Sequence, residues 1–227
     1  MNDSEALWSG PQQASRRLVL LHGWGADADD LLDLGELLVG PHQQRVALRA
    51  PLPHPAGTGR QWYDLQQNGW PQLPGALVDL RRRLLDLHQS VPLEHTVLLG
   101  FSQGAAMALN IAAGTAAGTA AGRTPGGGGS AAEPLPVAGV VACSGYPHPG
   151  WEPAALAGRT LAGSPDLEVL LTHGEQDPVV PHGASVELQR LLLQAGANVE
   201  LLSFSGGHTI DPDLFAAMRA FIERCWR

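Results

Sequence analysis

The stretch TVLLGFSQGAAMAL at residues 96–109 decides the fold of this chain. Its first half is a run of β-branched and leucine residues that predicts a buried strand, and its second half is an alanine-rich run that predicts a helix. The pentapeptide GFSQG between them predicts a sharp turn, where side chains in place of the two glycines would strike the neighbouring strand and helix. A chance GxSxG match is the alternative in a chain with 28 glycines, but the flanking runs favour the turn. Ser102 is therefore the candidate nucleophile.

A serine hydroxyl needs a base that accepts its proton, so the turn predicts an acid and then a histidine later in the chain. The apolar run 167–172 predicts a buried strand, and the polar run HGEQDP after it predicts a loop at the C-terminal edge of a parallel sheet. Asp177 in that loop is the expected orienting carboxylate. Glu175 is the weaker alternative, because its earlier place in the turn favours solvation.

His208 is the expected base. Only His182 and His208 follow Asp177, and His182 lies too close to the acid in sequence to reach the site independently. His208 lies between the predicted strand 199–204 and a final helix, in a loop that opens at the same edge of the sheet. We expect Ser102 to attack a carbonyl carbon, His208 to take and return the proton, and Asp177 to fix the imidazole tautomer.

Two backbone N–H groups are candidates for stabilising the oxyanion of a tetrahedral intermediate. The N–H of Gln103 follows the nucleophile at the start of the helix, where the helix dipole favours negative charge. The N–H of Trp24 follows the predicted strand 17–21 and lies between two glycines that let the backbone turn inward. His22 precedes both the serine and the acid in the chain, so its expected role is to shape this loop.

Several ordered motifs resemble the phospholipase/carboxylesterase family of α/β-hydrolases, to which acyl-protein thioesterases and small bacterial carboxylesterases belong. The resemblance spans about residues 17–225. Its motifs are HGWG (22–25), RQWYDL (60–65), GFSQGAAMAL (100–109), SGY (144–146), HGEQDPVVP (173–181) and GGH (206–208). The site residues that it implies are the triad Ser102, Asp177 and His208 and the oxyanion donors Trp24 and Gln103.

The resemblance also implies that the segment around Trp62 borders an acyl-binding groove, whose aromatic side chains suit apolar chains. Trp62 and Tyr63 have an alternative role as a packing cluster under a long loop. Tyr146 ends another predicted strand and is a further candidate for the groove wall. Val179 and Val180, just after the acid, are candidates for the same wall.

The expected fold class is α/β, an α/β-hydrolase fold in a single domain over residues 1–227. Six mostly continuous apolar runs predict a mostly parallel sheet with helices on both faces. The residues between these runs leave no room for a large cap domain. The low-complexity stretch 114–136 predicts a flexible surface loop. The six runs lie near residues 17–21, 45–49, 96–100, 137–143, 167–172 and 198–203.

The formal net charge of −8 argues against nucleic acid and anionic membranes as partners. Neutral or apolar esters and thioesters are the expected substrates. The basic run 81–83 is expected to be the solvated side of the helix whose leucines recur over 77–88. The acidic residues within 27–33 lack the spacing of a calcium loop and precede a helix, so we expect them to stabilise its dipole. No metal and no cofactor are expected.

Residues 1–13 lack the basic and then apolar pattern of a secretion signal, and no hydrophobic span follows, so a cytoplasmic protein without stable membrane insertion is expected. Cys143 and Cys225 are expected to be buried free thiols. A homodimer stays open, because exposed apolar side chains form either a dimer contact or loop packing. The residues concerned are Trp8, Trp70 and Trp151.

These features together predict a serine carboxylesterase that works through an acyl-enzyme. An acyl-protein thioesterase or lysophospholipase acting on longer chains is the alternative within this chemistry. Dienelactone-hydrolase-like chemistry is disfavoured, because such enzymes usually carry cysteine where this chain has Ser102. A hydrolase-fold protein that binds a small ligand without turnover is the alternative from another class. The intact series Ser102, Asp177 and His208 weighs against it.

Overall fold

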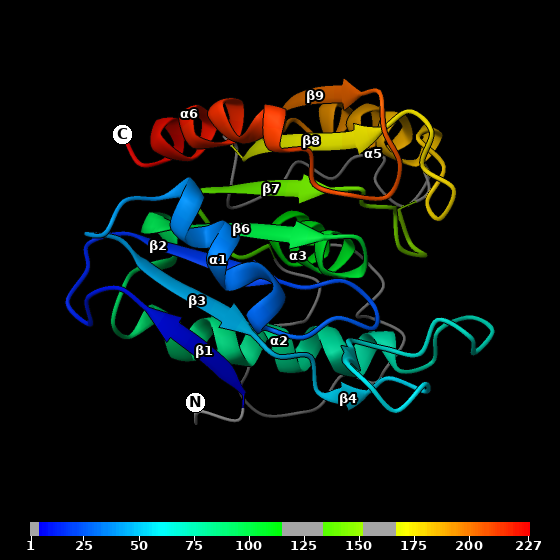
Figure 1. Cartoon of the computed structure of the whole chain (residues 1–227), viewed down its shortest axis with the longest axis horizontal. Coiled ribbons are helices and arrows are strands. Elements are labelled where there is room, and N and C mark those ends of the chain that lie inside the picture. Colours follow the sequence, from blue (N-terminus) through cyan, green and yellow to red (C-terminus); the bar gives the residue numbers. More distant parts are fainter. Residues whose placement is uncertain (1–4, 115–133, 152–166) are drawn as a thin grey trace.

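The computed structural model describes residues 5–114, 134–151 and 167–227. Its centre is a seven-stranded sheet in the order β1-β3-β2-β6-β7-β8-β9. All neighbouring strands run parallel except β1, which pairs antiparallel with β3 at one edge (Figure 1). The strands of this sheet are β1 (Ala6–Ser9), β2 (Arg17–Leu21), β3 (Gln44–Leu48), β6 (Thr96–Phe101), β7 (Gly139–Cys143), β8 (Glu168–Gly174) and β9 (Asn198–Phe204).

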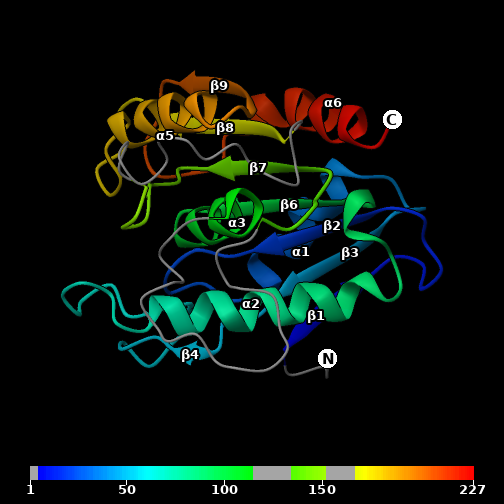
Figure 2. The same cartoon turned by 180° about the vertical axis from the view of Figure 1, so that it is seen from behind.

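Helices cover both faces of the sheet. Helices α1 (Asp29–Leu38) and α6 (Phe215–Cys225) lie in front of it in Figure 1 and contact each other. The opposite face, seen in Figure 2, carries α2 (Leu73–His88), α3 (Gln103–Ala113) and α5 (Gly183–Gln194). Because both faces are covered, the residues of β2, β3 and β7 are buried throughout. The expected mostly parallel sheet with helices on both faces is confirmed.

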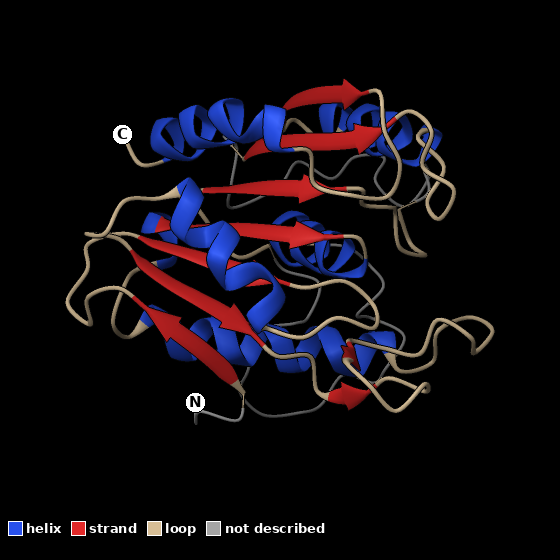
Figure 3. Ribbon diagram, viewed as in Figure 1, coloured by secondary structure: helices blue, strands red, loops and turns tan. Residues whose placement is uncertain are grey.

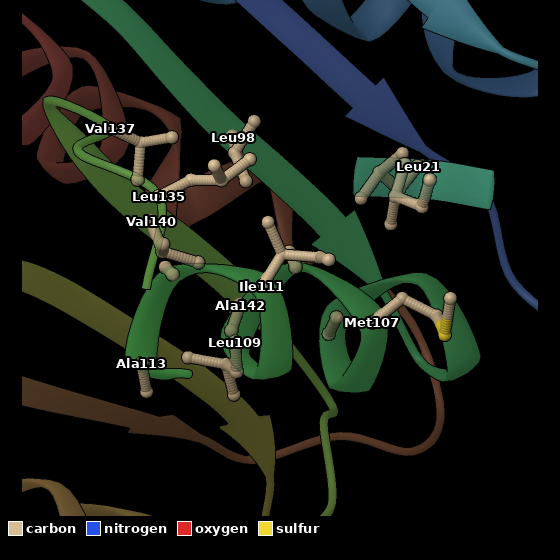
Figure 4. Close-up of a cluster of buried hydrophobic side chains, with 14 of the residues drawn as sticks. Leu21, Leu98, Met107, Leu109, Ile111, Ala113, Leu135, Val137, Val140 and Ala142 are labelled. Atoms are coloured by element: carbon tan, nitrogen blue, oxygen red, sulfur yellow. The ribbon is translucent and has the colours of Figure 1, made fainter. Parts of the chain in front are cut away.

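The core forms two apolar layers, one on each side of the sheet. The larger layer lies between the sheet and helices α2, α3 and α5, and the smaller lies under α1 and α6. Figure 4 shows part of the larger layer, where Ile111 of α3 and Leu98 of β6 fill the space between helix and sheet. This packing fixes α3, whose first residue follows Ser102 directly.

The six predicted strands correspond to β2, β3 and β6 to β9. Three further strands of the described residues were not predicted, because they are short and partly exposed. They are β1, β4 (Leu52–Pro53) and β5 (Arg60–Gln61). Two short 3₁₀ helices, Leu93–His95 and Pro212–Leu214, precede β6 and α6. Most of the predicted flexible loop 114–136 lies outside the described residues. The described helices all pack on the sheet faces, and none of them forms a cap.

Arg83 corrects the expectation that the basic run 81–83 is solvated. Its side chain is buried, donates hydrogen bonds to the carbonyl oxygens of Arg49 and Glu5, and lies over the ring of Trp62 with 6.0 Å between the guanidinium carbon and the ring centroid. Arg82 instead is exposed and pairs with Asp79 and Asp86 of its own helix. Helical spacing thus places one arginine of the run under the sheet edge and its neighbour in water.

The cysteine and tryptophan side chains differ in how far they are buried. Cys143 is buried as expected, whereas Cys225 is only half-buried, and both are free thiols. Trp151 is buried and packs in the core. Trp8 on β1 is 41% exposed, so it is the tryptophan of this group that stays available for a contact with another chain.

The carboxyl ends of the parallel strands meet at one edge of the sheet, toward which the arrows of β6, β7 and β8 point in Figure 3. Strand β2 lies between β3 and β6. The chain therefore leaves β2 and β6 toward opposite sides of the sheet, and a crevice opens between the loops that follow them. Ser102 follows β6 and Trp24 follows β2 at this edge.

Candidate active site

Ser102 lies on a strained turn between β6 and α3. Its φ of 52° and ψ of −115° lie in a region that residues with a side chain rarely occupy. Its N–H donates a 2.8 Å hydrogen bond to the carbonyl oxygen of Cys143 on β7. The turn requires glycine at Gly104, because a Cβ there would lie 2.6 Å from the carbonyl oxygen of His22 and closer still to that of Leu21.

The structure brings Ser102, His208 and Asp177 together from three separate loops. The Oγ of Ser102 lies 2.9 Å from Nε2 of His208, and Nδ1 of His208 lies 2.6 Å from Oδ2 of Asp177. Asp177 is the acceptor in the second pair, so Nδ1 of His208 carries the proton and Nε2 is free to accept the hydroxyl proton of Ser102. The three side chains thus form one continuous hydrogen-bonded row.

The carboxylate of Asp177 is buried and surrounded by donors. The N–H groups of Val179 and Val180 donate to its Oδ1 at 2.8 and 2.9 Å, while His208 donates to Oδ2. Burial alone would raise the pKa of this carboxyl group. The hydrogen bonds from His208, Val180 and Val179 outweigh burial and hold the pKa of Asp177 below its usual value. The acid is therefore ionised at neutral pH.

His173 at the end of β8 is a second histidine beside this acid, and sequence reasoning missed it. Its Nε2 lies 2.9 Å from the carbonyl oxygen of Val180 and 3.3 Å from Oδ2 of Asp177, and its Nδ1 lies 2.6 Å from Oγ of Ser185. Burial lowers the pKa of His173, so the ring is neutral. The neutral ring donates from Nε2 to Val180 and accepts from Ser185 at Nδ1. The predicted strand ended at residue 172, whereas β8 runs two residues further and includes His173.

Of the two expected oxyanion donors, Trp24 lines the pocket beside Ser102 and Gln103 follows Ser102 directly. Within the part of the chain that the structure describes, the backbone N–H groups of Gln103 and Trp24 have no protein acceptor. Gln103 is the first residue of α3, where N–H groups have no partner inside the helix. Its side chain is held by Trp62, whose N–H donates to Oε1, and by the carbonyl oxygen of Tyr63, which accepts from Nε2.

The loop that carries Trp24 is fixed by a neighbouring loop. The indole N–H of Trp24 donates a 2.8 Å hydrogen bond to Oε1 of Gln61, and the N–H of Gly25 donates to the carbonyl oxygen of Arg60. His22 is buried, donates from Nδ1 to the carbonyl oxygen of Gly23 and accepts at Nε2 from the N–H of Ala50. Its predicted role in shaping the loop agrees with these contacts.

A mostly apolar pocket of about 630 Å³ opens beside Ser102 and His208. Of the groove residues expected from the sequence, Tyr146, Val179 and Val180 line it. Sequence reasoning missed the rest of its apolar wall, because these residues come from separate segments with no common pattern. They are Ala26, Leu65, Trp70, Phe101, Pro181 and Ala184.

The segment around Trp62 borders the pocket through Leu65, but the side chains of Trp62 and Tyr63 do not, which corrects their expected place in the groove. Both are buried in the core and neither lines the pocket, as the packing alternative proposes. The Trp62 indole N–H donates to the carbonyl oxygen of His22, which ties this residue to the loop that carries Trp24. The Tyr63 hydroxyl lies 2.6 Å from that of Tyr146 and 2.8 Å from Nε2 of His148. These two residues thus support the site from beneath.

The two alternatives to the expected acid and base lie elsewhere. Glu175 is exposed in the turn before Asp177, as its position predicts. His182 lies 2.7 Å from Oγ of Ser203 through its Nε2 and contacts the ring of His173. Asp177 and His208 are therefore the acid and the histidine that the fold places next to Ser102.

The acidic run before α1 serves local structure. Asp27 pairs with Arg49 at 2.7 Å, and Asp29 and Asp30 lie in the first turn of α1, where they favour its dipole. In residues 5–114, 134–151 and 167–227 no group of three or more acidic, histidine or cysteine side chains is arranged to hold a metal ion. None of the helices described there is long and apolar enough to cross a membrane.

Comparison with known proteins places the chain in a family. The sequence model of the Phospholipase/Carboxylesterase family matches residues 2–122 and 129–226. The esterase YpfH of Escherichia coli strain K12 is 25% identical over an alignment 227 positions long, and the match covers 92% of this chain and 83% of that protein. The crystal structure of esterase PE8 is 28% identical with a TM-score of 0.77, and the match covers 97% of this chain and 98% of the other.

Solved structures with lower identity share the fold. Acyl-protein thioesterase 2 of Zea mays is 23% identical with a TM-score of 0.73, over 98% of this chain and 99% of that one. The Bacillus cereus carboxylesterase is 20% identical with a TM-score of 0.74, over 97% and 93%. The expected α/β-hydrolase fold is confirmed. The family match covers nearly all of the sequence, and the chain therefore belongs to the phospholipase/carboxylesterase family of hydrolases that act on esters.

Proposed function

We propose that this protein is a serine carboxylesterase that works through an acyl-enzyme, with Ser102 as nucleophile, His208 as general base and Asp177 as orienting acid. The observation that carries the proposal is the row of hydrogen bonds from Ser102 Oγ through His208 to Asp177, at 2.9 and 2.6 Å. A nucleophile, a base and a third group that orients the base make up the arrangement that activates serine.

Acylation begins when Oγ of Ser102 attacks the ester carbonyl carbon while Nε2 of His208 takes the hydroxyl proton. The ionised Asp177 stabilises the imidazolium that forms. The carbonyl oxygen becomes an oxyanion that accepts hydrogen bonds from the N–H groups of Gln103 and Trp24. Each such donor contributes about 3 kcal/mol to lowering the barrier. The intermediate then collapses, and Nε2 of His208 gives its proton to the departing alcohol or thiol.

Deacylation repeats the chemistry with water as nucleophile. His208 takes a proton from the water as it attacks the acyl carbon on Ser102, and the collapse of the second intermediate returns a proton to Oγ. The products are the free acid and the original enzyme. Every proton is carried by His208, so the mechanism needs no cofactor.

Substrate class follows from the pocket beside Ser102. Its apolar wall suits an uncharged acyl chain, and the protein's net charge of −8 disfavours strongly anionic substrates. A thioester or a lysophospholipid with a longer chain has the same reacting group, and its acyl chain suits the same wall. Acyl chain length is therefore the property that separates a small-ester carboxylesterase from the acyl-protein thioesterase or lysophospholipase alternative.

The experiment is hydrolysis of a p-nitrophenyl ester series from acetate to palmitate by the wild type and by Ser102→Ala. We expect the wild type to turn over at least the short members, and the variant to lose about 10⁶-fold in kcat, as serine hydrolases do when the nucleophile is removed. Circular dichroism of both proteins checks that the variant is folded. Turnover of no ester by the wild type would instead favour the hydrolase-fold ligand-binding alternative.

A further inference from the structure

A second apolar chamber lies on the other side of His208. It has a volume of about 380 Å³ and shares four lining residues with the larger pocket: Gly23, Ala26, Phe101 and His208. Its own wall comes chiefly from Leu31 and Leu34 of α1, from Ile210, and from Phe215 at the start of α6. The larger pocket takes its own wall from the segments around Trp70, Tyr146 and α5 instead.

A partition of two rings, tilted by 42° to each other, separates the hollows. The ring centroids of Phe101 and His208 lie 4.8 Å apart, and both rings line both hollows. A Cβ on Gly23 would lie 3.1 Å from the Phe101 ring, so the backbone of Gly23, in the loop that carries Trp24, closes the partition on one side. The two chambers therefore meet at the edge of the sheet where His208 Nε2 faces Ser102. The second chamber lies on the face covered by α1 and α6 (Figure 1).

The wall of the second chamber carries little charge. Asp30 is the one carboxylate among the described residues that line it. It is exposed, and its Oδ2 accepts a hydrogen bond from the N–H of Asp27. Burial lowers the pKa of His22, so this ring is neutral, and both its nitrogens are used within the protein. Among the residues that the structure describes, no lysine or arginine lines the chamber. The wall suits an uncharged apolar group and disfavours an anion.

We infer that the second chamber is the leaving-group subsite and holds the uncharged, apolar alcohol of the ester, while the larger pocket holds the acyl chain. The inference rests on the proposed function. The two parts of an ester diverge from the carbon that Ser102 attacks, and the leaving oxygen has to lie within hydrogen-bond reach of His208 Nε2 to receive its proton. Ser102 lines only the larger pocket, whereas His208 lines both. An alcohol that departs past His208 therefore enters the second chamber.

Two ester series separate the chambers. One keeps the acyl group as acetyl and lengthens the alcohol from methyl to hexyl, with acid release followed in a pH-stat. The other keeps p-nitrophenol as leaving group and lengthens the acyl chain from acetyl to octanoyl. The readout is the slope of log kcat/KM against chain length, because kcat/KM reports the acylation step in both series. A fully buried methylene contributes about three- to fourfold to this constant.

Leu34→Trp and Leu65→Trp are matched variants, because the same substitution fills one chamber or the other at a half-buried leucine. We expect Leu34→Trp to reduce the gain in kcat/KM from methyl to hexyl acetate by about tenfold and to leave the slope of the acyl series unchanged. Leu65→Trp should flatten only the acyl slope. Leu37→Trp, on the exposed side of α1, controls for the helix and should change neither. Leu34→Phe replaces Leu34→Trp if the larger side chain prevents folding.

Charge gives a second arm. An acetate ester whose alcohol ends in a carboxylate should react at least several-fold more slowly than hexyl acetate with the wild type. The inference is overturned if Leu34→Trp and Leu65→Trp act on the same slope, if Leu34→Trp acts on the acyl slope alone, or if the anionic alcohol is preferred. Failure of the proposed function has a different signature, since the wild type then hydrolyses neither series, and the inference falls with it.

Discussion

Replacing His173 by leucine tests how the acid of the site is held in place. The imidazole bridges two elements, since Nε2–H donates to the carbonyl oxygen of Val180 and Nδ1 accepts from the hydroxyl of Ser185 on α5. Val180 in turn donates its N–H to Asp177. Leucine fills a similar volume but offers neither a donor nor an acceptor. The substitution therefore leaves one buried carbonyl oxygen and one buried hydroxyl group without their partner.

The magnitude follows from those two groups. A buried polar group that loses its partner costs about 1–3 kcal/mol, so the two groups together should lower the free energy of unfolding of His173→Leu by about 2–6 kcal/mol. The loop of Asp177 also loses its contact with Nε2 of His173 at 3.3 Å. We expect kcat for a p-nitrophenyl ester to fall with it, because the acid no longer holds His208 in one orientation.

Urea unfolding followed by circular dichroism measures the loss. His182→Leu is the matched control, because His182 makes the same kind of contact with one exposed hydroxyl group, on Ser203, and lies in contact with the His173 ring. We expect that control to lose less than about 1 kcal/mol. The reasoning is refuted if His173→Leu unfolds within about 0.5 kcal/mol of the wild type, or if both variants lose the same amount.

Three further predictions test other parts of the account. Gly104→Ala should lower kcat/KM by at least about 10²-fold, because its Cβ would press on the carbonyl oxygen of His22 and displace the loop that carries Trp24. The control Gly75→Ala, with open space around it on α2, should keep full activity, and equal effects of the two substitutions would contradict this reasoning. Burial lowers the pKa of His148 to about 3, so the stability that its neutral ring provides is complete above pH 6.5 and is lost as the pH falls, by about 2 kcal/mol at pH 5. His148→Gln should reduce this dependence of the free energy of unfolding on pH in urea titrations, and an unchanged dependence would exclude this ring as the source. Arg83→Met should lower the free energy of unfolding by about 2–4 kcal/mol in thermal or urea unfolding, because two backbone carbonyl oxygens lose a charged donor. Arg82→Met should change it by no more than about 0.5 kcal/mol, and a larger loss in Arg82→Met than in Arg83→Met would show that the buried arginine was misidentified.

Local patterns predicted the elements that carry Ser102, Asp177 and His208. A strand, a glycine-bounded turn and a helix leave one serine at a fixed position, and the strand ends of a parallel sheet gather the loops behind it. The order of serine, acid and histidine then limited the choice to a few side chains. The proposed oxyanion donors, the N–H groups of Trp24 and Gln103, follow from the same local geometry, because each lies just after a strand.

Contacts between distant segments could not be read from these patterns. Trp62 has an aromatic side chain of the kind expected in an acyl groove, yet it is buried, and its indole N–H donates a hydrogen bond to the carbonyl oxygen of His22. His173 reads as a loop residue, but β8 continues far enough to bury it against Asp177. Arg83 reads as solvated because its neighbours are, although helical rotation turns it toward the core. In each case the tertiary partner lies more than a helical turn away or in another element.

The central claim is that Ser102 carries the acyl group during turnover. The most direct test is a rapid-quench reaction with p-nitrophenyl acetate, followed by mass spectrometry of the intact protein and of its peptides. The account predicts a burst of about one equivalent of p-nitrophenol and the mass of one acetyl group on the peptide that contains Ser102, with both lost in Ser102→Ala. Acetyl found on another residue, or a burst that survives in Ser102→Ala, would contradict it.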